Sequence, residues 1–243
     1  MVSNRHPGSS LQAHSMDALL PQILLRIVDL CLIAILFFAP LFMGGRHPVG
    51  RFVFVSITAI MAIAWLVRQC LLQRAVWRST AGQWLFFAAC CLVLFQVFPI
   101  SSEWMTTLAP STTDLLSLWS QGEQFENWSY LSFNPQSTKY GLAILFAYGI
   151  TFLITVQRVE TLADVQMILK WIAFATIGLA ILGLIQYLLK SENILWAYDQ
   201  SLRNKNGVHG SFTNPNHFSH ILVLGVGACA GWLLIRLKRP SAD

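Results

Sequence analysis

Six long apolar runs constrain the fold of this chain more than any other feature of its sequence. They cover residues 23–43, 52–67, 83–100, 138–156, 171–189 and 217–235. A nearly uncharged run of roughly 20 apolar residues is long enough to cross a bilayer as a helix. Only 11% of the 243 residues are charged, whereas about a quarter are charged in a soluble domain. The sequence therefore predicts an all-α, polytopic membrane helix bundle of about six transmembrane helices.

The charged residues between these runs predict the orientation of the chain. The 68–78 linker and the 236–239 segment are basic, whereas the 101–137 segment contains acids but no Lys or Arg. Lys and Arg are enriched in cytoplasmic loops, so both termini are expected in the cytoplasm and 101–137 is expected to be an outer-face loop. This distribution also explains the net charge of +5, and nucleic acid is not an expected partner.

Three regions are expected along the chain. Residues 1–20 are polar and lack the pattern of a signal peptide, so they are expected to form a disordered cytoplasmic tail. Residues 21–200 are expected to form a transmembrane bundle that carries the 101–137 loop, and residues 201–243 begin a further domain. Within the first run, Arg26 and Asp29 are either an interfacial pair or a functional charge inside the membrane.

A polar segment, residues 203–220 (RNKNGVHGSFTNPNHFSH), precedes the last apolar run. Asn214-Pro215 predicts a helix start, because Asn caps helices well and Pro suits the first helical position. The first turn of that helix is expected to offer unpaired N–H groups and the positive end of the helix dipole. With Arg203 and Lys205 nearby in sequence, the segment predicts a phosphate or diphosphate site.

Two other outer segments are expected at the same membrane face. The turn at 44–51 carries Arg46, and arginine can bind a diphosphate through two parallel hydrogen bonds. The tryptophans of the 101–137 loop either anchor it at the lipid headgroups or stack on sugar rings. The predicted diphosphate-binding residues are Arg203, Arg46, Lys205, Asn214, Asn216 and His217.

The polar residues of the 203–220 segment form no recognisable catalytic set. His217 and His220 are one helical turn apart, but no cysteine or carboxylate lies nearby in sequence to complete a metal site. Ser211 lacks the G-x-S-x-G context of a nucleophile. The five cysteines lie in or beside apolar runs and are expected to be small packing residues. No metal or other cofactor is predicted, and the catalytic residues stay unassigned.

Gly210-Ser-Phe-Thr-Asn-Pro-Asn-His-Phe-Ser219 resembles the G-x-F-x-N-x-N-x-h-A signature of the O-antigen ligase/polymerase family, which comprises bacterial membrane glycosyltransferases. The signature positions in this chain are Gly210, Phe212, Asn214, Pro215 and Asn216. Three further stretches are similar to the family in order and spacing: Pro40-Leu-Phe-Met-Gly-Gly45, Trp128-Ser-Tyr-Leu-Ser-Phe-Asn-Pro135 with Thr138, and Gly183-Leu-Ile-Gln-Tyr187.

The resemblance implies a transfer reaction at the periplasmic face of the bacterial inner membrane. A glycan on undecaprenyl diphosphate would move to an acceptor glycolipid such as the lipid A core, without a metal, while Arg203 and Arg46 hold the diphosphate. Family members have more helices than this chain, and a large periplasmic loop with a catalytic His and Arg. The chain is therefore expected to be the N-terminal half, with 201–243 a truncated start of the signature domain. Either it is a truncated or split gene product, or a second chain supplies the rest.

Two alternatives follow from the same residues. The chain could be a non-catalytic membrane protein that binds polyprenyl-diphosphate lipid or serves as a scaffold in envelope polysaccharide assembly. A transporter fragment is disfavoured, because transporters carry charged or broken-helix positions near the bilayer midplane, and such charges are rare here. The motifs leave the choice between ligase and polymerase open.

Overall fold

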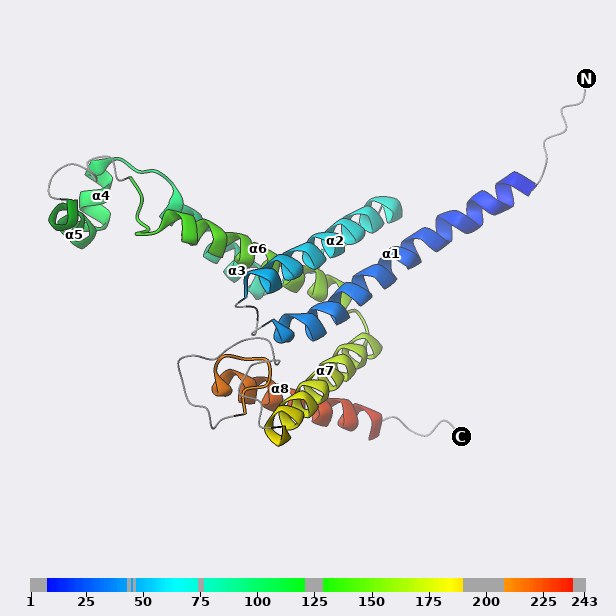
Figure 1. Ribbon diagram of the computed structural model, residues 1–243. Coiled ribbons are helices and arrows are strands. Elements are labelled where there is room, and N and C mark those ends of the chain that lie inside the picture. The colour runs from blue at the N-terminus through cyan, green and yellow to red at the C-terminus, as the bar shows by residue number, and fades with distance from the viewer. Residues whose placement is uncertain are drawn as a thin grey trace, which may run out of the picture. The chain divides into compact units, whose positions relative to one another are not determined.

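The computed structural model describes residues 8–42, 45, 47–73, 77–120, 129–189 and 208–237. Eight helices form the regular structure of these residues (Figure 1). They are α1 (Gly8–Leu41), α2 (Pro48–Leu72), α3 (Ala81–Val97), α4 (Ser102–Leu108), α5 (Pro110–Ser120), α6 (Pro135–Arg158), α7 (Leu162–Leu188) and α8 (Pro215–Leu237). Leu19–Leu41 of α1 and the whole of α2, α6, α7 and α8 are long and apolar enough to cross a membrane. The predicted all-α, multi-pass membrane architecture is confirmed.

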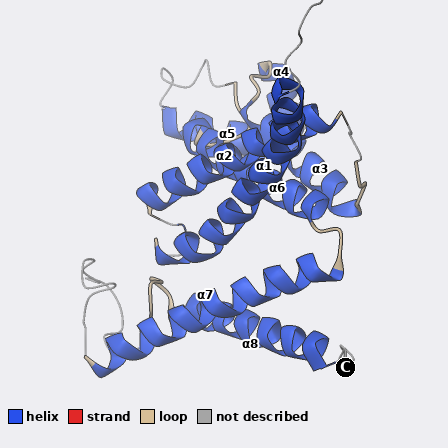
Figure 2. Cartoon of the chain, turned by 90° about the vertical axis from the view of Figure 1, so that its right-hand side faces the viewer, coloured by secondary structure: helices blue, strands red, loops and turns tan. Residues whose placement is uncertain are grey.

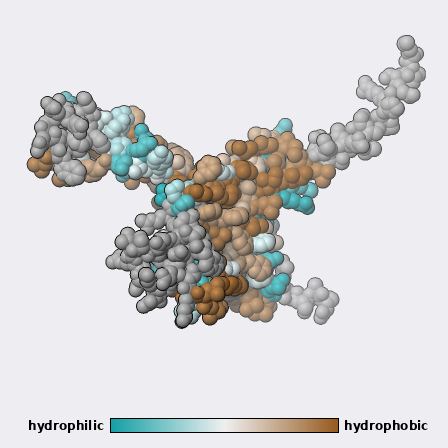
Figure 3. Space-filling model, viewed as in Figure 1, coloured by the Kyte–Doolittle hydropathy of each residue, from teal (hydrophilic) through white to brown (hydrophobic). Residues whose placement is uncertain are grey.

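The outer surfaces of the helices are apolar. Phe52, Leu85 and Leu224 are 74%, 72% and 59% exposed, and Figure 3 shows apolar side chains over much of the described surface in its view. Large exposed apolar surfaces are rare on soluble monomers. In a bilayer they face hydrocarbon, and the helices satisfy their own backbone polar groups.

The chain divides by its internal packing into two units, Met1–Trp77 with Ile154–Asp243, and Arg78–Leu153. In the first unit, α1 packs against α2, and α7 packs antiparallel to α8 (Figure 2). Small residues let α7 and α8 approach closely: Gly225 of α8 faces Thr176, and Gly183 of α7 faces Phe218.

The second unit contains α3, α4, α5 and most of α6. The glycines at 82 and 149 lie against Phe152 and Phe86, so α3 packs antiparallel along α6. With 17 residues, α3 is at the lower limit of a membrane-spanning helix. Part of the expected 101–137 loop is helical, as α4 and α5. The N–H of Ile100 donates a hydrogen bond to the carbonyl oxygen of Ser129 at 2.7 Å. This bond links the segment before α4 to the segment before α6.

Two helix starts differ from the sequence expectation. Helix α1 begins at Gly8, so residues 8–20 are helical where a disordered tail was expected. Helix α7 begins at Leu162 rather than near 171. The reason is a capping box: Asp164 N–H donates to Thr161 Oγ1, and the Asp164 carboxylate accepts from Thr161 N–H.

Candidate functional site

Residues 208–218 form a tight turn that leads into α8. Gly210 has φ +58°, in the left-handed region, and the N–H of Phe212 donates to the carbonyl oxygen of His209 at 3.0 Å. A Cβ on Gly210 would lie 2.5 Å from the Phe218 ring. Glycine is therefore required here by both its backbone conformation and the lack of space.

Ser211 fastens this turn to the end of α1. Its side chain is completely buried, and its Oγ donates to the carbonyl oxygen of Pro40 at 2.6 Å. Pro40 lies in the last turn of α1, where carbonyl groups have no partner within the helix. The hydroxyl therefore satisfies a helix-end acceptor and fixes the turn against α1.

Two aromatic side chains anchor the same segment in the apolar core. Phe212 and Phe218 are 8% and 5% exposed, and their ring centroids are 6.2 Å apart. With Leu179 of α7 they form a buried cluster, and Leu41 of α1 packs against it. The signature residue Phe212 is thus an anchor within the fold.

Three of the four stretches that carry the family resemblance meet at this point. The end of α1 contributes Pro40, α7 contributes Gly183 against the Phe218 ring, and the 210–219 stretch supplies Ser211. The fourth stretch belongs to the other unit, where Ser132 Oγ and Thr138 Oγ1 are 2.7 Å apart. Its first residue, Trp128, lies outside the described residues.

The predicted start of α8 is confirmed, but the donors expected there are occupied. Pro215 is the first helical residue and has no N–H. The Asn214 side chain caps the helix, its Oδ1 accepting from Asn216 N–H at 2.9 Å. The N–H groups of His217 and Phe218 donate to the Asn214 carbonyl, at 3.1 and 3.4 Å. The expectation of unpaired first-turn N–H groups was therefore wrong, because the cap and the proline use them up.

What the helix start presents is a set of side chains. Those of Asn214, Asn216, His217 and His220 are exposed, and the two imidazole centroids are 6.4 Å apart. Amide and imidazole groups can donate hydrogen bonds to phosphate or sugar oxygens. A ligand here would therefore be bound by side chains.

The predicted basic partners of this surface, Arg46, Arg203 and Lys205, lie outside the described residues. Of the tryptophans of the outer loop, Trp104 is 62% exposed. Within the described residues, no group of three or more His, Cys, Asp or Glu side chains is placed to hold a metal. The five cysteines are free thiols, and two of them, Cys31 and Cys90, are buried.

Gln186 is a polar residue of this region to which the sequence assigned no role. It lies on α7 one turn after Gly183 and is 7% exposed, and its Nε2 has no hydrogen-bond acceptor among the described residues. A buried donor without an acceptor costs about 1–3 kcal/mol. The sequence signal that could have drawn attention to Gln186 is its place in the Gly183–Tyr187 stretch.

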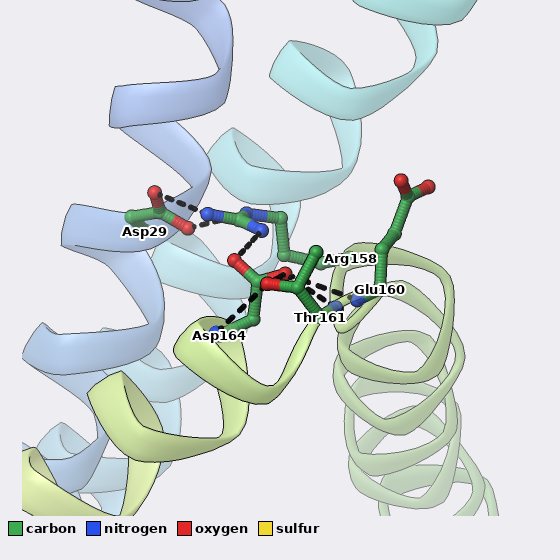
Figure 4. A network of polar contacts seen from close by, with 5 residues as sticks. All are labelled: Asp29, Arg158, Glu160, Thr161 and Asp164. Carbon is green, nitrogen blue, oxygen red and sulfur yellow. Dashed lines mark hydrogen bonds and ion pairs between the residues drawn. The ribbon is translucent and has the colours of Figure 1, made fainter. Parts of the chain in front are cut away.

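A second polar cluster, which we call the Arg158 cluster, consists of Asp29, Arg158 and Asp164 (Figure 4). Arg158 Nε and Nη2 lie 2.7 and 3.0 Å from the two Asp29 carboxylate oxygens, and Nη1 lies 2.7 Å from Asp164 Oδ1. The other Asp164 oxygen accepts from the N–H groups of Glu160 and Thr161. Asp29 therefore pairs with Arg158, whereas Arg26 was the partner considered from the sequence.

Comparison of the chain with protein-family models, with curated proteins and with solved structures found no match. The fold and the site together define a multi-pass α-helical membrane protein with a turn fixed by buried anchors at the start of its last described helix.

Proposed function

We propose that this chain binds the diphosphate of a polyprenyl-linked glycan at the 203–220 segment and takes part in an O-antigen ligase-type glycosyl transfer. The observation that carries the proposal is that some residues of the segment are buried and others are exposed. Ser211, Phe212 and Phe218 are buried and fix the turn, whereas Asn214 and Asn216 are exposed. A rigid support with exposed polar side chains is what a binding site requires.

The chemistry of the ligand follows from the groups that the segment offers. Arg203 and Lys205 precede the turn in the sequence, and exposed amide and imidazole groups follow it. Basic and neutral donors together suit a diphosphate that carries a sugar. The polyprenyl chain places such a ligand in the membrane, where the apolar helices of this chain also lie.

In the proposed transfer, the bond between the sugar anomeric carbon and the diphosphate oxygen breaks, and a new bond forms to a hydroxyl of an acceptor glycolipid. The leaving diphosphate gains negative charge. We assign its stabilisation to Arg203, Lys205 and Arg46. The acceptor hydroxyl loses its proton to a base that we assign to a second chain. The proposed location is the periplasmic face of the inner membrane, with both termini in the cytoplasm.

A second candidate function is binding without catalysis, as a polyprenyl-diphosphate-binding or scaffold protein of envelope polysaccharide assembly. Residues 208–237 contain no Asp or Glu, so this part of the chain offers no carboxylate as a base. The same surface would hold the lipid in either case.

The test is complementation of a ligase-deficient bacterium, with surface glycan resolved on a gel. The chain is expressed alone and with a second polypeptide that carries a catalytic periplasmic loop, and polyprenyl-diphosphate binding is measured on the purified chain. Restoration only with the second polypeptide supports the transferase. Binding without restoration supports the non-catalytic function, and loss of both overturns the proposal.

A further inference from the structure

The end of α8 that is opposite to the 208–218 turn lies beside a row of four aromatic rings. Phe37 of α1, Trp171 and Phe174 of α7, and Trp232 of α8 contact one another edge to face in that order. Their successive centroid distances are 6.1, 5.9 and 6.0 Å. We call these four residues the aromatic row. It connects three membrane-spanning helices of the first unit.

Two exposed cations lie over this row. Lys170 Nζ is 5.6 Å from the Trp171 ring centroid and 5.7 Å from that of Phe174. Arg236 Cζ is 5.0 Å from the Trp232 centroid. Since Phe174 and Trp232 are in contact, the aromatic row connects the two cations across neighbouring helices. Contact with the rings holds each cation against apolar surface while its charged end stays exposed.

Neither cation is neutralised within the part of the chain that the structure describes. There, Lys170 and Arg236 form no ion pair with a carboxylate, whereas Arg158 has two carboxylates within 2.7 Å. Two exposed cations at the edge of an apolar helix pair can attract an anion from their surroundings. At a membrane surface, the available anion is the phosphate of a lipid.

We propose that Lys170, Arg236 and the aromatic row bind the headgroup of an anionic phospholipid. Its phosphate would lie between the two cations, its glycerol region beside Trp171 and Trp232, and its acyl chains along the apolar surfaces of α7 and α8. Trp232 and Arg236 follow Pro215 by 17 and 21 residues along α8, which separates this site from the start of the helix by roughly 26–32 Å. The site is therefore distinct from the proposed glycan site, and in the proposed orientation it faces the cytoplasmic leaflet.

The experiment measures which lipids remain bound to the purified full chain. The protein is reconstituted in nanodiscs with equimolar phosphatidylglycerol and phosphatidylcholine, and retained lipids are quantified by mass spectrometry after detergent exchange. We expect the wild type to retain phosphatidylglycerol in excess. In the K170Q/R236Q variant the excess should fall about tenfold, because each basic residue near a membrane surface favours anionic lipid.

The matched control is K139Q/R51Q, which removes the same two charges elsewhere. Lys139 also lies over an aromatic ring, 5.9 Å from the centroid of Tyr130. This variant should keep the wild-type lipid ratio. Equal retention of both lipids by the wild type, or an equal fall in the control, would overturn the proposal.

A second measurement does not depend on whether a charge variant folds. Phospholipids with brominated chains quench tryptophan fluorescence on contact. Brominated phosphatidylglycerol should quench the wild type more than brominated phosphatidylcholine does, and W232F should lose part of this difference. The control W104F, which changes a tryptophan of α4, should not. No difference between the two lipids would refute the site.

Discussion

The Arg158 cluster and the 208–218 turn are both polar regions of an apolar helix bundle, but they treat their polar groups differently. In the cluster, the Arg158 guanidinium binds two carboxylates, and backbone N–H groups occupy a remaining Asp164 oxygen. In the turn, the Ser211 hydroxyl is paired inward, while the side chains of Asn216 and His217 are exposed.

This difference separates groups that hold the fold from groups that can bind a ligand. A charge inside a membrane protein is often a sign of function. The charges of the Arg158 cluster, however, are paired with one another. They connect α1, the end of α6 and the start of α7. The side chains of Asn216 and His217 are neutral and exposed, and the proposed ligand is assigned to this surface for that reason.

The largest effect is expected from breaking the Arg158 cluster. Arg158→Leu leaves Asp29 and Asp164 without a counter-charge in an apolar setting. Removing one partner of a fully buried ion pair costs about 3–5 kcal/mol, and these side chains are 12–20% exposed, so the loss should approach the lower end of that range. We expect the variant to unfold at a much lower SDS fraction in mixed micelles, followed by circular dichroism.

The control is Glu160→Gln, a charge change at a neighbouring exposed side chain. It should shift the free energy of unfolding by less than about 0.5 kcal/mol. Similar unfolding curves for the two variants would show that the cluster does not hold the three helices together. The distinction between polar groups that hold the fold and polar groups that can bind a ligand would then fail.

The next effect concerns the shape of the turn. Gly210→Ala forces an alanine into the left-handed region and against the Phe218 ring, at an expected cost of about 2–4 kcal/mol. Gly227→Ala is the matched control, because a Cβ there meets no atom within 4 Å. Alanine favours the helix, so this control should be neutral or stabilising. A Gly210 variant as stable as the control would contradict the close packing of the turn.

A third prediction tests the ligand side of the comparison. Arg203→Ala should weaken binding of a polyprenyl-diphosphate lipid by about 1.5–3 kcal/mol, the value of a charge-assisted hydrogen bond, and leave unfolding unchanged. Arg26→Ala, at an exposed position of α1, is the control and should bind the lipid like the wild type. Equal binding by all three proteins would remove Arg203 from the site.

The sequence predicted the helices well because membrane insertion requires long apolar runs. The core of each predicted helix lies within an observed one. The start of α7 was misplaced, since the Thr161–Asp164 capping box was overlooked, and α4 and α5 were expected to be loop. The Arg158 cluster could not be predicted, because its ion pair joins residues 129 positions apart. Pairing at such a separation depends on how α1 and α6 pack, which local patterns do not encode.

At the candidate site, local chemistry was predictable and long-range anchoring was not. Asn214-Pro215 predicted the capped start of α8 correctly, because a cap involves only neighbouring residues. The same cap uses a first-turn N–H group that was expected to bind anions. The inward bond of Ser211 to Pro40 O crosses 171 positions, so the serine could be judged from sequence only as a poor nucleophile.

The smallest predicted effect tests that anchoring role. Ser211→Ala removes the hydroxyl that reaches the α1 end from the turn and leaves the Pro40 carbonyl without this donor. The loss should be about 1 kcal/mol of unfolding free energy, with lipid affinity unchanged once the folded fraction is taken into account. Ser219→Ala is the control, because the exposed Ser219 hydroxyl bonds only to Asn216 O of its own helix. Equal stability of the two variants would mean that burial of Phe212 and Phe218 alone fixes the turn, and the polar side chains would then be held in place by packing rather than by the hydrogen bond.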